Sequence, residues 1–108
     1  MSSVVWTGET GRLYRYQVCD LAKPWLDVPG NFILARAAGN VLTAIYVGQT
    51  ASLRDRLPAY VEWEVARHAG ATHLLAHVNF AGERPRVDET ADLVRAYMPT
   101  LNEQHRAA

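Results

Sequence analysis

The chain has 108 residues, of which 49% are apolar and 20% charged, and its eleven basic side chains balance eleven acidic ones. This balance excludes a disordered chain, and it means that any nucleic-acid binding needs a local basic patch rather than net charge. The single cysteine, Cys19, excludes an internal disulfide and a cysteine-rich zinc site.

The length predicts one domain. The N-terminus has no basic stretch followed by an apolar core, and no apolar run approaches the length of a membrane span. We therefore expect a cytoplasmic protein with no membrane partner.

The first half of the chain predicts three strands. They are expected over residues 12–18, 31–36 and 41–47. In the first of them Tyr14, Tyr16 and Val18 alternate with polar residues, which is the period of a half-buried strand. The other two are joined across Ala37-Ala38-Gly39-Asn40, a sequence that suits a hairpin turn.

The second half predicts helix, strand and helix. A helix begins at Ser52, where Ser52 and Asp55 have the spacing of a capping box, and Pro58 kinks or splits it. The later elements are expected as a helix over 59–69, a strand over 72–79, a polar loop over 81–86 and a helix over 88–98. This order predicts an α/β (α+β) domain, with a small, mainly antiparallel sheet of three to four strands flanked by helices.

Two histidines have a spacing that would suit zinc on a helix. On the expected strand, however, His73 and His77 lie about 13 Å apart, too far to share one ion. We expect both on one face of the sheet, together with Leu75 and Asn79.

The most informative segment is Tyr46-Val47-Gly48, which ends a β-branched run and leads into an arginine-bearing helix. Arg56 follows Tyr46 by ten residues and Tyr60 follows it by fourteen, and Pro99-Thr100-Leu101-Asn102 lies near the C-terminus. These residues and spacings resemble the GIY-YIG nuclease family, in particular the incision domain of excision-repair nucleases.

The likeness extends over about residues 28–102 and leaves the N-terminal strand outside it. Pro29-Gly30-Asn31-Phe32-Ile33-Leu34 resembles the first triplet of the family, with Phe32 in place of its tyrosine. The resemblance implies a single GIY-YIG-like domain built on the predicted hairpin.

It also implies a metal-dependent endonuclease that cleaves phosphodiester bonds in DNA. Tyr46 would help to activate the attacking water, Arg56 would bind the scissile phosphate and Tyr60 would donate to the substrate. Glu89 would hold Mg²⁺ or Mn²⁺ through its oxygens. Further substrate-binding positions implied by the resemblance are Gly48, Gln49, Arg54 and Asn102.

Two departures from the family pattern favour a different function. Phe32 lacks the hydroxyl of the first triplet, and aligning the closing segment puts Thr90 where the metal-binding carboxylate is expected. Glu89 is one residue earlier, which on a helix turns it about 100° away. Thr90 lies above Val94, Tyr97 and Leu101, which we expect on the buried side of this helix. The alternative is a catalytically impaired GIY-YIG-fold module that binds nucleic acid or a protein partner.

Each residue also has a simpler interpretation when taken alone. Tyr46 suits a core ring, Arg54 and Arg56 suit a solvated face, and Glu89 suits the first turn of a helix. The sequence leaves open whether DNA or RNA is preferred, and the small surface makes a homodimer or a protein partner reasonable.

Overall fold

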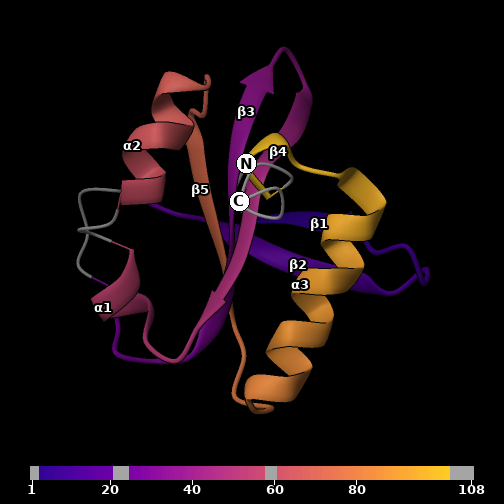
Figure 1. Ribbon diagram of the computed structural model, residues 1–108, viewed down its shortest axis with the longest axis vertical. Coiled ribbons are helices and arrows are strands. Elements are labelled where there is room, and N and C mark those ends of the chain that lie inside the picture. The colour runs from indigo at the N-terminus through magenta and orange to yellow at the C-terminus, as the bar shows by residue number, and fades with distance from the viewer. Residues whose placement is uncertain (1–2, 21–24, 58–60, 103–108) are drawn as a thin grey trace.

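The computed structural model describes residues 3–20, 25–57 and 61–102. The described residues form an α+β domain in which helices flank one five-stranded antiparallel sheet (Figure 1). The elements are β1 Ser3–Thr7, β2 Leu13–Val18, β3 Gly30–Ala38, β4 Val41–Thr50, α1 Leu53–Arg56, α2 Val61–His68, β5 His73–Val78 and α3 Glu83–Tyr97. The predicted fold class is confirmed, but the predicted count of three to four strands is wrong.

The additional strand is β1, which forms a hairpin with β2. Trp6 lies opposite Tyr14, and in the intervening turn the Gly8 N–H donates to the Arg12 carbonyl over 2.8 Å. β1 has five residues and no clear alternation, so its structure depends on pairing with β2. The usable signal was the run of β-branched and aromatic residues before a glycine-bearing turn.

The strands lie in the order β1-β2-β5-β3-β4, with β4 at one edge. The predicted hairpin of β3 and β4 is confirmed. Its register is interrupted by a bulge, because Leu34 pairs with Tyr46 whereas Ala35 pairs with Ala44. Ile45 is the extra residue, and both Ile45 and Tyr46 consequently pack on the same side of the sheet.

The sheet has a helix layer on each face: α1 and α2 lie on one side and α3 on the other (Figure 1). Because successive strand residues point to opposite faces, Phe32 and Leu34 enter the core on the α1–α2 side. Ile33 and Leu75 enter the second core, where they pack with Leu93 of α3. No helix in the described ranges is long and apolar enough to cross a membrane.

The first two helices follow the sequence prediction closely. The Ser52 side chain accepts from the Asp55 N–H over 3.2 Å, so Ser52 is the N-cap of α1. The reciprocal bond of the predicted capping box is replaced, because the Ser52 N–H donates to the Thr50 hydroxyl over 3.1 Å. α1 ends at Arg56 and α2 begins at Val61, while Pro58 lies outside the described residues.

The last helix begins five residues before the predicted start, at Glu83 rather than Asp88, so the predicted polar loop over 81–86 is wrong. Pro85 lies in its first turn, where a helix does not need the missing N–H. The helix ends at Tyr97, its C-cap Met98 has a left-handed backbone (φ 45°), and Pro99 follows as expected.

Candidate functional site

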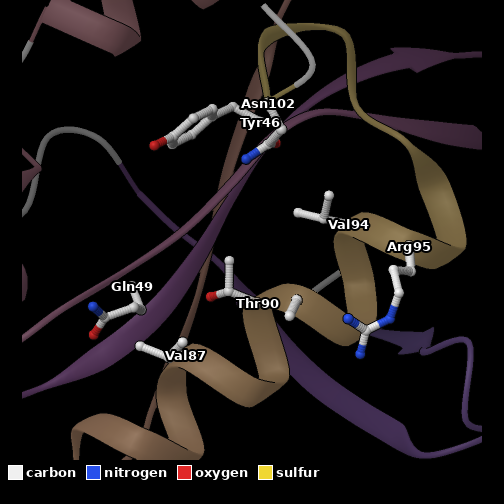
Figure 2. Close-up of a pocket in the computed structure, with 8 residues that line it drawn as sticks. Tyr46, Gln49, Val87, Thr90, Val94, Arg95 and Asn102 are labelled. Atoms are coloured by element: carbon white, nitrogen blue, oxygen red, sulfur yellow. The ribbon is translucent and has the colours of Figure 1, made fainter. Parts of the chain in front are cut away.

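A hollow of about 520 Å³ lies between the edge strand β4 and α3 (Figure 2). It brings together three of the residues predicted from the sequence, Tyr46, Gln49 and Asn102, with Thr90 from the helix. The remaining lining residues are Val87, Ala91, Val94 and Arg95. The hollow is therefore lined by apolar side chains of α3 together with polar groups from β4, from Thr90 and Arg95 of the helix, and from Asn102.

The phenol of Tyr46 extends to the other side of β4, and its hydroxyl points away from α3 in Figure 2. Its ring centroid lies 6.1 Å from that of Phe32. The guanidinium carbon of Arg56 lies 5.7 Å from the centroid of the same Phe32 ring. Phe32 therefore supports both groups, one from the bulged edge of β4 and one from α1.

Gly48 is needed for this arrangement. It lies opposite Phe32 in the β3–β4 ladder, and a Cβ at Gly48 would stand 2.5 Å from the Cζ atom of the ring. The absent side chain leaves the space that the fully buried ring of Phe32 occupies.

Asn102 joins the segment that follows α3 to the strand that carries Tyr46. Its side-chain oxygen accepts from the Val47 N–H over 2.8 Å, and its NH₂ group donates to the Val47 carbonyl over 2.9 Å. These two bonds satisfy backbone groups that an edge strand would otherwise expose. The side chain of Asn102 therefore stabilises the site from its border.

Two further residues were predicted for the site, Arg54 and Tyr60. Arg54 is exposed and lies 3.2 Å from carboxylate oxygens of both Asp27 and Asp55. Tyr60 lies outside the described residues.

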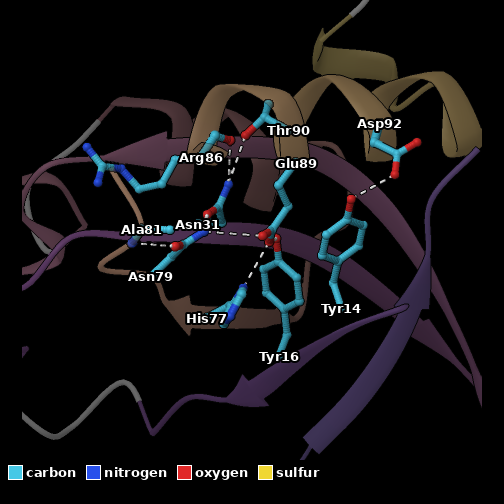
Figure 3. A network of polar contacts seen from close by, with 10 residues as sticks. All are labelled: Tyr14, Tyr16, Asn31, His77, Asn79, Ala81, Arg86, Glu89, Thr90 and Asp92. Atoms are coloured by element: carbon cyan, nitrogen blue, oxygen red, sulfur yellow. Dashed lines mark hydrogen bonds and ion pairs between the residues drawn. The ribbon is translucent and has the colours of Figure 1, made fainter. Parts of the chain in front are cut away.

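Glu89 is buried on the face of α3 that packs against the sheet (Figure 3). The Tyr16 hydroxyl donates to its Oε2 atom over 2.6 Å, and the Nδ1 atom of His77 lies 3.0 Å from the same oxygen. The NH₂ group of Asn79 donates to the other oxygen over 3.3 Å. Glu89 therefore does not line the hollow, whereas Thr90 does.

The protonation equilibria of this cluster reflect the buried carboxylate. The hydrogen bond with Glu89 is the largest cause that raises the pKa of His77, although partial burial opposes it. Burial, together with the negative charge of Glu89, raises the pKa of Tyr16. Glu89 thus keeps a protonated phenol and favours a protonated imidazole beside it.

A second acid of α3 holds the N-terminal hairpin in a similar way. Asp92 accepts from the Thr10 N–H and the Thr10 hydroxyl, over 2.9 and 2.8 Å, and from the Tyr14 hydroxyl over 2.8 Å. Burial alone would raise the pKa of Asp92, but these hydrogen bonds lower it overall. Burial and the bond to Asp92 raise the pKa of Tyr14 to about 12.

The sequence interpretation placed the wrong stripe of α3 on its buried side. Thr90, Val94, Tyr97 and Leu101 were expected there. Leu101, which follows the helix, is buried, yet Tyr97 is 40% exposed, with its ring 5.3 Å from that of Trp6. The buried residues of α3 are Arg86, Glu89, Asp92 and Leu93. This rotation follows from the polar partners that β2 and β5 offer to the two acids.

The residues present do not fit the divalent metal that the resemblance implies beside Tyr46. Both oxygens of Glu89 are engaged in the interior, and Thr90 brings only a hydroxyl to the hollow. Within the described ranges, no group of three or more His, Cys, Asp and Glu side chains is arranged to hold a metal ion.

The sequence interpretation missed three polar partners that decide where Glu89 points. Tyr16 and His77 were placed only on faces of their strands, and Asn79 was assigned no role. The available signal was the match between two acids three residues apart on a helix and two tyrosines two residues apart on a strand. Arg86 was missed because its segment was predicted to be a loop.

No family model, no curated protein and no solved structure matches this chain.

Proposed function

We propose that the protein is a GIY-YIG-like domain that binds nucleic acid, in the first place DNA, around Tyr46 and Arg56, and that its cleavage of phosphodiester bonds is impaired. The observation that carries this proposal is the burial of Glu89, which is 5% exposed and bonded to Tyr16 and His77. The carboxylate that the endonuclease interpretation needs therefore faces the interior.

The binding part of the proposal is supported by Arg56. A guanidinium group presents a planar fork of donors that matches the oxygens of a phosphate. Packing of Arg56 against the Phe32 ring reduces the conformational freedom that the side chain would lose on binding. Because the chain has no net positive charge, such a positioned cation is more useful than a diffuse charge.

The second candidate is a metal-dependent endonuclease that uses Mg²⁺ or Mn²⁺, with Tyr46, Arg56, Tyr60 and Glu89 as its catalytic residues. The observation in its favour is that Tyr46 and Arg56 both pack on Phe32, although they come from different elements. In this candidate Glu89 would have to exchange its bonds to Tyr16 and His77 for the metal.

Binding is tested by fluorescence anisotropy with labelled duplex DNA at fixed salt. We expect Arg56→Ala to weaken binding about tenfold, which corresponds to about 1.4 kcal/mol. The matched control is Arg67→Ala, which removes an exposed arginine of α2 that pairs with Glu64, and it should change affinity little. Equal affinities of the wild type and Arg56→Ala would overturn the assignment of the binding surface.

Cleavage is tested with supercoiled plasmid in Mg²⁺ or Mn²⁺. We expect the wild type to retain the plasmid without nicking it. Nicking that is lost in both Arg56→Ala and Glu89→Gln would establish the second candidate instead.

A further inference from the structure

Arg86 differs in exposure and in pairing from four other arginines of the helices, each of which has an ion pair. Arg54, Arg67, Arg84 and Arg95 have side chains between 53% and 85% exposed, and each lies within 4.0 Å of a carboxylate. Arg86 is only 6% exposed, and no carboxylate among the described residues pairs with it. The least solvated of these cations therefore has no counter-charge from the described protein.

The contacts of Arg86 fix its position without neutralising it. Its Nε–H donates to the side-chain oxygen of Gln49 over 3.0 Å, and its backbone carbonyl accepts from the NH₂ group of Asn31 over 2.9 Å. In Figure 3 its guanidinium group points away from Glu89. Its two terminal nitrogens have no hydrogen bond to the described residues, and they are not fully buried, so an anion can approach them from solvent.

The partner that would offset the charge is an anion from outside the described protein. Because the oxygen of Gln49 accepts from Arg86, its NH₂ group is the part of the amide that can donate to such a ligand. Gln49 also lines the hollow that Tyr46 borders, and it lies three residues further along β4, about 10 Å in an extended strand.

We propose that Arg86 and Gln49 form an anion subsite that takes a backbone phosphate of the bound nucleic acid, distinct from the phosphate at Arg56. This inference rests on the proposed function for the identity of the ligand. The chemistry of the subsite, a positioned guanidinium next to an amide NH₂, requires only an oxyanion.

The salt dependence of DNA binding separates this role from a purely structural one. Each phosphate contact contributes about 0.9 to the slope of log K against log salt concentration, so Arg86→Gln should reduce the slope by about that amount. It should also weaken binding about tenfold. Arg84→Gln removes the same charge two residues earlier, from a side chain 85% exposed and paired with Asp88, and should leave the slope unchanged.

A folded Arg86→Gln variant with the wild-type affinity and slope would overturn the inference. An equal loss of slope in Arg84→Gln would also overturn it, because the effect would then be one of general charge. If Arg86→Gln does not fold, Gln49→Ala takes its place, since it removes the group that positions the guanidinium. Its slope should also fall, and an unchanged slope would overturn the subsite.

Inorganic phosphate provides a test that does not depend on nucleic acid. We expect millimolar phosphate to raise the Tm of the wild type and of Arg84→Gln, and to raise that of Arg86→Gln less. This result in a protein that retains no DNA would support the subsite and overturn the proposed function. If the wild type retains DNA but phosphate raises the Tm of all three proteins equally, the proposed function would be supported and the subsite overturned.

Discussion

The two sides of α3 have opposite characters. The side that packs on the sheet carries charged residues, of which Glu89 and Asp92 are bonded to tyrosines of β2. The side that faces the hollow carries Val87, which is 42% exposed, and Thr90. Glu89 and Asp92 therefore hold the N-terminal hairpin, and no carboxylate of this helix lines the hollow beside Tyr46.

The largest expected effect comes from removing the interior acid. Glu89→Ala leaves the Tyr16 hydroxyl and the His77 ring without their shared partner, and should lower the free energy of unfolding by about 3 kcal/mol. Urea denaturation followed by circular dichroism measures this loss. The control Asp88→Ala removes an exposed acid from the preceding position and should cost less than about 0.5 kcal/mol. Equal losses would contradict the difference between the two sides of the helix.

A smaller effect is expected at the tyrosine-bearing edge of the sheet. Gly48→Ala places a methyl group against the Phe32 ring and should lower the free energy of unfolding by about 2 kcal/mol. The same substitution in a Phe32→Leu background should cost less, because the smaller side chain leaves room. Equal costs in both backgrounds would show that the ring does not set the requirement for glycine.

The smallest effect is a change in stability with pH. Because the pKa of His77 is raised in the folded protein, its contribution is fully present below the unfolded value of about 6.5 and is lost as the pH rises through the folded pKa. His77→Gln should therefore destabilise the protein more at pH about 5.5 than at pH about 8.5, by less than about 1 kcal/mol. Denaturation at the two pH values measures the difference, and a larger cost at the higher pH would contradict the pairing with Glu89.

Local signals in the sequence were sufficient for several elements. The turn before Val41 predicted the hairpin, and Ser52 predicted the start of α1, because both depend on residues next to each other in the chain. β1 was missed because a five-residue strand gains its structure from its partner rather than from its own pattern.

The orientation of α3 illustrates a limit of reasoning from periodicity. The structure places Thr90 rather than Glu89 in the hollow that Tyr46 lines, and Tyr97, which was expected on the buried side, is exposed. Glu89 and Asp92 turn inward because Tyr16 and Tyr14 donate hydrogen bonds to them, and both tyrosines belong to a strand outside the family resemblance. No pattern within the helix alone contains this information.

The commitment of Glu89 to the interior is tested most directly by titrating Mn²⁺ into ¹⁵N-labelled protein and following the amide resonances. We expect no saturable paramagnetic broadening centred on Glu89, Thr90 and Gly48, and the same lack of broadening in Glu89→Gln. Saturable broadening at these three amides that disappears in Glu89→Gln would contradict the closed network, because Glu89 would then be free to bind metal beside Tyr46.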